Sequence, residues 1–96
     1  MKYEKEYNQF LTAWGIEAQT NMAIEEMSEL TKELCKLNRA KNDPEKAEKV
    51  RKNIQEEIAD VLNMVEQLQL FYGKDEIDKQ RDYKINRTQE RLSRWG

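Results

Sequence analysis

Histidine is absent from this chain of 96 residues. Its absence excludes a histidine general base, zinc sites built from cysteine and histidine, and the glutamate–histidine type of di-iron site. Any chemistry at this protein must therefore use carboxylates, amides, lysine, arginine, tyrosine, or a metal ion held by oxygen ligands.

Cysteine, proline and glycine are scarce, with one, one and three residues respectively. The single cysteine, Cys35, cannot form an intramolecular disulfide and suits a reducing compartment. No apolar run approaches the ~20 residues that span a bilayer, and the charged start MKYEKEY lacks the apolar stretch of a signal peptide. We therefore expect a cytoplasmic protein that has no membrane partner.

Positive charge is missing from two long windows of the sequence. The formal net charge is only −2, which argues against a nucleic-acid polymer as partner, because proteins that bind one usually carry a basic face. None of the 17 lysines and arginines falls in residues 6–31 or 53–73. The two acidic segments described below lie within these windows.

The length and composition predict one domain over residues 1–96 with a thin core. Apolar residues make up 38% of the chain and charged residues another 38%. A lone domain of this size and composition would be marginally stable. We therefore expect burial against further copies of the chain, as a homodimer or homotetramer.

The apolar residues recur at helical spacing, which predicts an all-α fold, an antiparallel four-helix bundle-like domain. We expect Gly15 and Gly73 to end the first and third helices, Asp43 to cap the third ahead of Pro44, and Asp75 to cap the fourth. The predicted helices span about 3–14, 17–40, 44–72 and 76–94.

One acidic pattern occurs twice, in AIEEMSEL (23–30) and IQEEIADV (54–61). The apolar stripes of the two helices superimpose with a constant offset of 31 residues, which also maps Glu26 onto Glu57 and Glu29 onto Asp60. At about 100° per residue, all four carboxylates lie at the border of their apolar stripe and on the same side of it.

An antiparallel hairpin brings these four carboxylates to one level. Residue 43 is the midpoint both of 26 and 60 and of 29 and 57. It is also the turn that Asp43–Pro44 predicts independently. Glu26 should therefore lie level with Asp60, and Glu29 level with Glu57.

Acidic residues beside an apolar stripe are most often solvated and paired with a basic residue one turn away. Here the positions three and four residues from Glu26, Glu57 and Asp60 hold no basic residue, and Glu29 has only Lys32. Unpaired carboxylates at one level repel one another and raise one another's pKa. A bound cation would offset this repulsion, and an all-oxygen ligand set favours Mg²⁺, with Mn²⁺ as a substitute.

The motif Glu26-x-x-Glu29, a spacer, and Glu57-x-x-Asp60 resembles the mark of the MazG-like all-α nucleoside triphosphate pyrophosphohydrolases. The helical layout of the whole chain also fits the small single-domain members of that superfamily. The resemblance implies that these four residues are metal ligands and catalytic residues of a Mg²⁺-dependent hydrolase. It further implies that the enzyme cleaves an NTP or dNTP to the monophosphate and pyrophosphate, as an oligomer with active sites close to subunit interfaces.

The family usually places basic residues on the helix after the second motif. Lys84, Arg87 and Arg91 share one face of the predicted last helix and are therefore candidates to bind phosphate, although such a stretch is often a solvated helix end. For the base, the amides of Gln19 and Asn63 are candidate contacts. Phe10 and Trp14 either stack on the base or, as is more common for aromatics at this spacing, belong to the core.

In the implied mechanism, the four carboxylates hold Mg²⁺, a water attacks the α-phosphorus, and Lys84 and Arg87 support the leaving pyrophosphate. Glu25 and Glu56 are spare candidates for the general base, and neither is assigned. The main alternative is a non-enzymatic helical oligomer with the same fold. A second alternative is a dedicated substrate such as dUTP, dCTP or phosphoribosyl-ATP, in place of house-cleaning of non-standard nucleotides.

Overall fold

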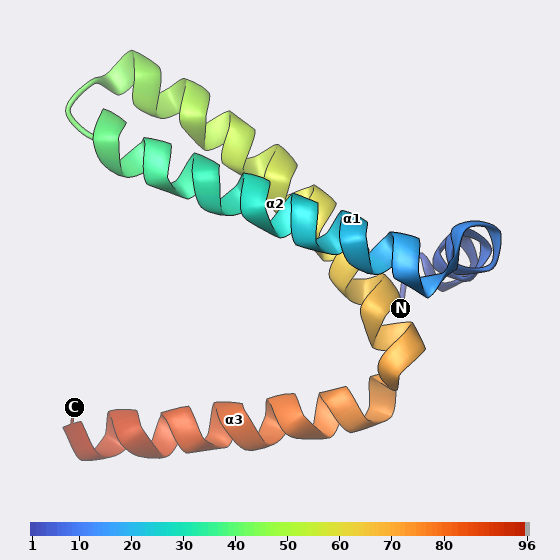
Figure 1. The fold of residues 1–96 in the computed structure, drawn as a ribbon. Coiled ribbons are helices and arrows are strands. Elements are labelled where there is room, and N and C mark those ends of the chain that lie inside the picture. The colour runs from blue at the N-terminus through green and yellow to red at the C-terminus, as the bar shows by residue number, and fades with distance from the viewer. Residues whose placement is uncertain (96) are drawn as a thin grey trace.

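The structure is a computed structural model that describes residues 1–95. These residues form three α-helices and no strand, which confirms the all-α prediction (Figure 1). The helices are α1 (Glu4–Ala40), α2 (Pro44–Tyr72) and α3 (Lys74–Trp95).

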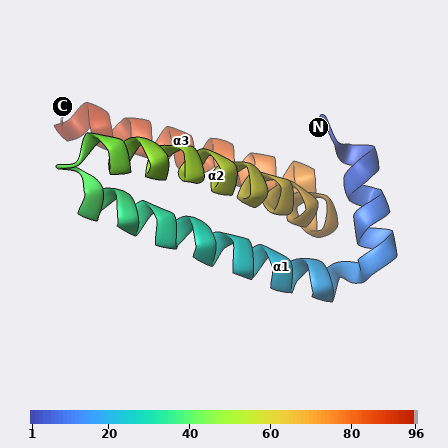
Figure 2. The same ribbon diagram turned by 90° about the horizontal axis from the view of Figure 1, so that it is seen from above.

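The second part of α1 and the whole of α2 form an antiparallel hairpin (Figures 1 and 2). At the turn, the Asp43 side chain accepts a hydrogen bond from the backbone N–H of Lys46 at 3.2 Å, and Pro44 is the first residue of α2. A carboxylate at the N-cap and a proline in the first turn both stabilise a helix start. The predicted turn and the predicted span 44–72 are therefore confirmed.

Gly15 divides α1 into two arms that the sequence predicted as separate helices. Its φ of 86° and ψ of 159° lie outside the helical region, whereas the residues on both sides are helical. Glycine adopts this conformation readily, but a residue with a Cβ does so only under strain. The N-terminal arm consequently turns away from the rest of α1 (Figure 2).

A single residue, Gly73, joins α2 to α3. Its N–H donates to the carbonyl of Gln69 at 3.0 Å, and its own carbonyl accepts from the N–H of Ile77 at 3.1 Å. Because α3 begins immediately after Gly73, the predicted cap at Asp75 is wrong. Asp75 lies instead in the first turn of α3, where its charge complements the helix dipole.

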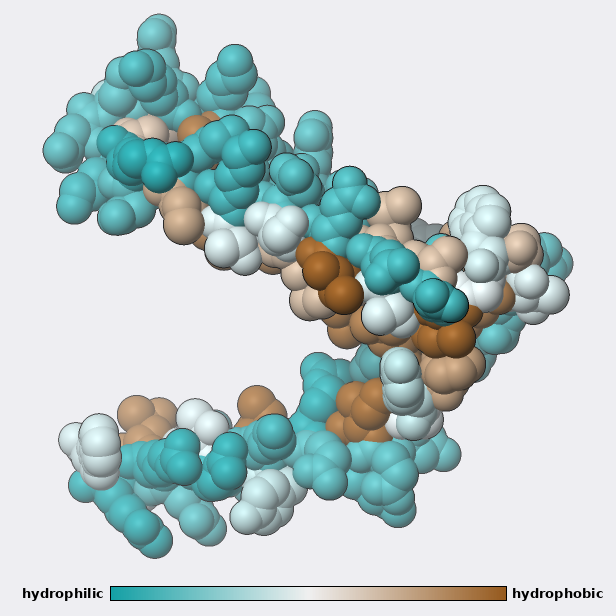
Figure 3. All heavy atoms as spheres, viewed as in Figure 1, coloured by the Kyte–Doolittle hydropathy of each residue, from teal (hydrophilic) through white to brown (hydrophobic). Residues whose placement is uncertain are grey.

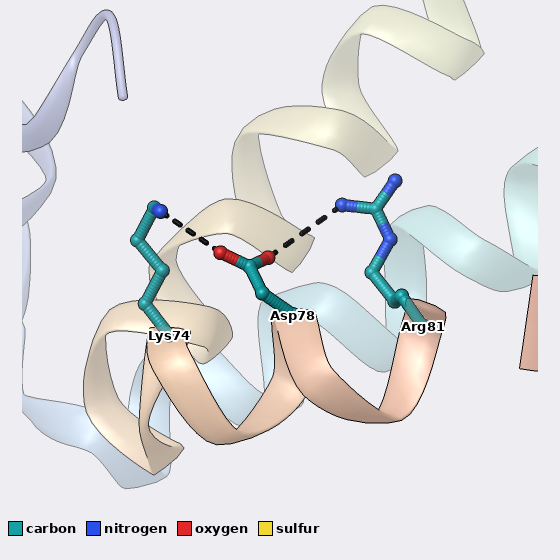
Figure 4. A network of polar contacts seen from close by, with 3 residues as sticks. All are labelled: Lys74, Asp78 and Arg81. Carbon is teal, nitrogen blue, oxygen red and sulfur yellow. Dashed lines mark hydrogen bonds and ion pairs between the residues drawn. The ribbon is translucent and has the colours of Figure 1, made fainter. Parts of the chain in front are cut away.

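The rest of α3 is loosely attached to the molecule. It packs against α2 only, and none of its residues is buried. Its first turns carry local ion pairs from Asp78 to Lys74 at 3.0 Å and to Arg81 at 3.9 Å (Figure 4), and exposed pairs of this kind contribute little stability. The radius of gyration is 16.9 Å, against about 12–13 Å for a compact chain of this length. A single chain therefore does not close a four-helix bundle.

The apolar stripe of the hairpin is only partly covered. Ala23 and Ile54 are buried, but Met27, Leu34 and Ile58 remain 41%, 49% and 43% exposed. Apolar residues reach the surface where the hairpin meets the start of α3 (Figure 3). The thin core expected from the composition is thus observed within one chain.

Replacing Gly15 by alanine should lower the stability of the fold. The added Cβ meets no neighbouring atom. However, an alanine at this position can adopt a φ of 86° only with a backbone strain of about 1–3 kcal/mol. For a domain of this size, this strain corresponds to a fall in Tm of roughly 4 °C or more, measurable by circular dichroism. Thr12→Ala, at an exposed position of the same arm, should leave Tm nearly unchanged. An unchanged or higher Tm for Gly15→Ala would show that the kink imposes no constraint.

Candidate functional site

Three of the four predicted carboxylates lie together on one side of the hairpin. Glu26, Glu57 and Asp60 each present an oxygen, and these oxygens all lie within 4.8 Å of one another. Glu26 and Glu57 are half-buried, and Asp60 is exposed. Glu29 is exposed and lies outside this group of three. The cross-helix register derived from the Asp43 turn thus brings Glu26 to Asp60.

The electrostatics of this carboxylate cluster are unfavourable without a cation. Partial desolvation, followed by the charges of Asp60 and Glu57, raises the pKa of Glu26 above its ordinary value. Desolvation also comes first in raising the pKa of Glu57, and the charges of Asp60, Glu29 and Glu33 add to it. Within residues 1–95, no lysine or arginine forms an ion pair with Glu26, Glu57 or Asp60.

Two carboxylate oxygens in this region are buried without a hydrogen-bond partner among the described residues, namely Oε2 of Glu57 and Oε2 of Glu33. Buried polar atoms are normally paired, so each calls for an explanation such as an ion or water. The orphaned Glu57 oxygen fits a hard cation bound at the cluster. Neither Glu25 nor Glu56 is part of this arrangement, and both are exposed.

The sequence reasoning did not single out Glu33. Glu33 is a buried residue with an exposed fraction of 8%. Its Oε1 accepts a hydrogen bond from the Lys36 ammonium at 3.0 Å. A signal was present in the sequence, because Glu33 lies four residues after Glu29 on the same helix face.

A pocket of about 620 Å³ lies directly beside the cluster and shares Glu26 and Asp60 with it. Its volume falls in the range of small-molecule sites. The remaining lining residues are aromatic, apolar or amide-bearing: Phe10, Trp14, Ala18, Gln19, Met22, Asn63, Met64 and Gln67. The structure therefore brings the predicted base contacts Gln19, Asn63 and Trp14 to the same hollow as two predicted metal ligands.

The aromatic wall of the pocket is formed by Phe10 and Trp14. Their rings stack with centroids 5.4 Å apart and an interplanar angle of 20°. Trp14 is 62% exposed, so it is not a core residue in this chain. An exposed indole at the edge of a pocket offers a face on which a planar ring can stack.

A chain of amides fixes the polar wall. The side-chain nitrogen of Gln67 donates to the backbone carbonyl of Asn63 at 3.0 Å, which leaves its side-chain oxygen to accept from Gln19 Nε2 at 2.7 Å. Gln19 and Gln67 are 7% and 2% exposed. Oε1 of Gln19 is then the atom of this pair that remains to accept a hydrogen bond from a ligand. The sequence did not lead us to predict Gln67 as a site residue, although it lies seven residues after Asp60 on the same helix face.

Tyr7 ties the N-terminal arm to α2, in part through Asn63, which lines the pocket. Its hydroxyl lies 2.7 Å from Glu66 Oε1 and 3.0 Å from Asn63 Oδ1, and the residue is 2% exposed. Burial, followed by the hydrogen bond to Glu66 and its charge, raises the pKa of the Tyr7 hydroxyl above its ordinary value. This anchor holds Phe10, one turn later in the same arm, at the pocket. Neither Tyr7 nor Glu66 was predicted as a site residue.

The predicted phosphate contacts Lys84, Arg87 and Arg91 do not reach the pocket in a single chain. All three are exposed on α3, and none lines the pocket. The Arg87 guanidinium lies instead over the Tyr83 ring, 5.8 Å from its centroid.

Comparison with models of known protein families, with curated proteins and with solved structures found no match to this chain. In the described part of the chain, no helix is sufficiently long and apolar to cross a membrane.

Glu57→Gln should stabilise the metal-free fold at neutral pH. Because folding raises the pKa of Glu57, ionisation of this group opposes folding as the pH rises above the ordinary value of 4.5. The neutral amide avoids that cost, so the variant should melt at a higher temperature than the wild type at pH 7.5 in chelator. The difference should narrow as the pH falls through 4.5, because the wild-type group then becomes protonated in the unfolded state as well as in the folded state.

Thermal melts followed by circular dichroism at pH 4 and pH 7.5 measure this difference. The control is Glu17→Gln, an exposed carboxylate on α1 that should give no such gain at pH 7.5. A Glu57→Gln variant that melts below the wild type at pH 7.5 without metal would contradict the repulsion described above.

Proposed function

We propose that this protein is a Mg²⁺-dependent nucleoside triphosphate pyrophosphohydrolase, which converts an NTP or dNTP to the monophosphate and pyrophosphate. The observation that carries the proposal is the shared pocket, where Glu26 and Asp60 lie beside a stacked aromatic pair and a fixed amide acceptor. Carboxylates suit a phosphate-bound metal, and the aromatic and amide walls suit a base. The resemblance of Glu26-x-x-Glu29 and Glu57-x-x-Asp60 to the MazG-like motif supports the same activity.

In this proposal, Glu26, Glu57 and Asp60 hold Mg²⁺ and Glu29 is the fourth ligand. The donor set fits, because it consists of oxygens alone, forms no ion pair with a lysine or arginine among residues 1–95, and includes a buried oxygen without a partner. When bound, Mg²⁺ supplies neutralisation of phosphate charge and lowers the pKa of a coordinated water. The reaction class is hydrolysis at the α-phosphorus, with pyrophosphate as the leaving group.

The nucleoside end of the substrate would occupy the pocket. Phe10 and Trp14 provide the stacking face, and Oε1 of Gln19 accepts a hydrogen bond from an N–H on the base edge. The Tyr7 and Gln67 hydrogen bonds hold these groups in place before substrate arrives. Such pre-organisation reduces the entropy lost on binding.

We also propose that the chain assembles as a homodimer or homotetramer in which helices of several copies complete the bundle. The exposed apolar side chains Met27, Leu34, Ile58 and Leu62 support assembly, and none of them lines the pocket. Assembly could therefore bury them and leave the pocket open. Lys84, Arg87 and Arg91 would contribute to phosphate binding only if α3 lies beside a carboxylate cluster in the assembled protein.

Glu57→Gln should remove Mg²⁺-dependent release of pyrophosphate from a panel of NTPs and dNTPs, with a loss of ~100-fold or more in kcat/KM. The amide keeps the size of the side chain and loses the charge that binds metal. Products are separated by HPLC, which reports the bond that is cleaved and the preferred base together. Glu17→Gln should retain wild-type activity. If the wild type releases no pyrophosphate from any nucleotide, the non-enzymatic alternative is correct.

Mg²⁺ should raise the Tm of the wild type and leave that of Glu57→Gln nearly unchanged. A ligand that binds only the native state adds about 1.4 kcal/mol at ten times its Kd. At this length, that is a rise of several degrees by circular dichroism. Equal shifts in the two proteins would show that the metal binds elsewhere.

A further inference from the structure

One cation of α1 is paired with the buried residue Glu33. Lys36 donates to Glu33 Oε1 at 3.0 Å, and Glu33 lies seven residues, or two helical turns, after Glu26. The ion pair with Glu33 holds the Lys36 ammonium in place. The Lys36 side chain is 40% exposed, so the ammonium is still accessible to a ligand. An ammonium has three donor hydrogens, and Glu33 Oε1 uses one of them.

Lys36 lies on the same face of α1 as the acidic residues. Glu26, Glu29, Glu33 and Lys36 follow one another at spacings of three, four and three residues, which keeps them on one side of a helix. Helix side chains point toward the N-terminus, so the Lys36 ammonium lies back at the level of Glu33. The ion pair with Glu33 agrees with this direction.

The groups of the site lie in order along the hairpin. Gln19 and Gln67 meet on the side of the carboxylates that faces the Gly15 kink, and Lys36 lies on the opposite side, nearer the turn. Along the axis, residue 33 is about 10 Å beyond Glu26 at 1.5 Å per residue. A nucleotide with its base against Phe10 and Trp14 and its α-phosphate at the metal would therefore direct its terminal phosphates toward Lys36.

Glu33 gives this arrangement a second, independent sign of a built site. The Glu33 side chain is 11% exposed and has one oxygen paired with Lys36 and the other buried without a partner among residues 1–95. Burying a carboxylate in this way costs stability unless its charge is compensated. Lys36 supplies part of that compensation, and Glu33 fixes the position of the ammonium.

We propose that Lys36 binds the β- and γ-phosphates of the substrate, and hence the pyrophosphate product, with Glu33 as the residue that positions it. This inference rests on the proposed function for the identity of the substrate. It supplies from within one chain the cation that phosphate binding requires and that α3 does not bring to the pocket. Charge-assisted hydrogen bonds from an ammonium to phosphate are among the stronger polar contacts in proteins.

The test is isothermal titration of the full-length protein with inorganic pyrophosphate in the presence of Mg²⁺. Lys36→Gln retains an N–H donor for Glu33 and loses the charge, so it should weaken pyrophosphate binding about tenfold or more. Lys36→Arg should largely restore the binding. AMP has no β- or γ-phosphate, so its affinity should be equal in all three proteins.

Two further variants separate Lys36 from other cations. Lys52→Gln removes an exposed lysine of α2 and should leave pyrophosphate binding unchanged. The double variant Lys84→Gln, Arg87→Gln measures what α3 contributes. If Lys36→Gln, shown to be folded by circular dichroism, binds pyrophosphate as tightly as the wild type, the assignment of Lys36 is wrong.

The same proteins assayed with the preferred nucleotide distinguish the two proposals. Lys36→Gln should raise KM and the inhibition constant of pyrophosphate and leave inhibition by the monophosphate unchanged. A wild type that hydrolyses the nucleotide, together with an unaltered Lys36→Gln, contradicts the role of Lys36 alone. A wild type that binds pyrophosphate through Lys36 but hydrolyses no nucleotide contradicts the proposed activity alone.

Discussion

The register of the α1–α2 hairpin is the constraint on which the rest of the structure depends. Asp43 caps α2 and Pro44 begins it, and these two residues set which positions of the helices lie level. Glu26 then meets Asp60, and Gln19 meets Gln67. A change of one residue in the turn would shift one helix by about 1.5 Å and rotate its side chains by about 100°. Both the carboxylate cluster and the amide pair would be lost together.

This register places carboxylates that repel one another side by side, and their repulsion lowers the stability of the fold. Half-burial raises the pKa of Glu26 and Glu57, and Oε2 of Glu57 has no hydrogen-bond partner among the described residues. Features that oppose stability are commonly retained where function requires them. A metal ion at Glu26, Glu57 and Asp60 would attract all three carboxylates and so offset their repulsion of one another. The hairpin would then serve as a rigid support that holds base, phosphate and metal groups in a line.

The remaining two elements differ in how firmly they are held. The N-terminal arm turns at Gly15 and is anchored by Tyr7, so its aromatic residues have a defined place at the pocket. No comparable anchor holds α3 beyond its first turns, and Ile85, Leu92 and Trp95 are 62%, 64% and 90% exposed. A lone helix of this length is only marginally stable in water without packing. The proposed assembly of several copies would give α3 the packing that one chain lacks.

The sequence by itself determined the local features of this protein. Helical periodicity, Gly15, Asp43–Pro44 and Gly73 predicted the hairpin and the helix spans, apart from the start of α3. The repeated acidic pattern and the turn at residue 43 predicted that Glu26 and Glu57 lie beside Asp60. Only the tertiary structure decided that Glu29 is exposed and outside the group of three carboxylates, that Gln67, Tyr7 and Glu33 support the site, and that α3 stands away from it. Spacing along a helix defines the face on which a side chain lies, whereas these contacts depend on the kink and junction angles that single glycines allow.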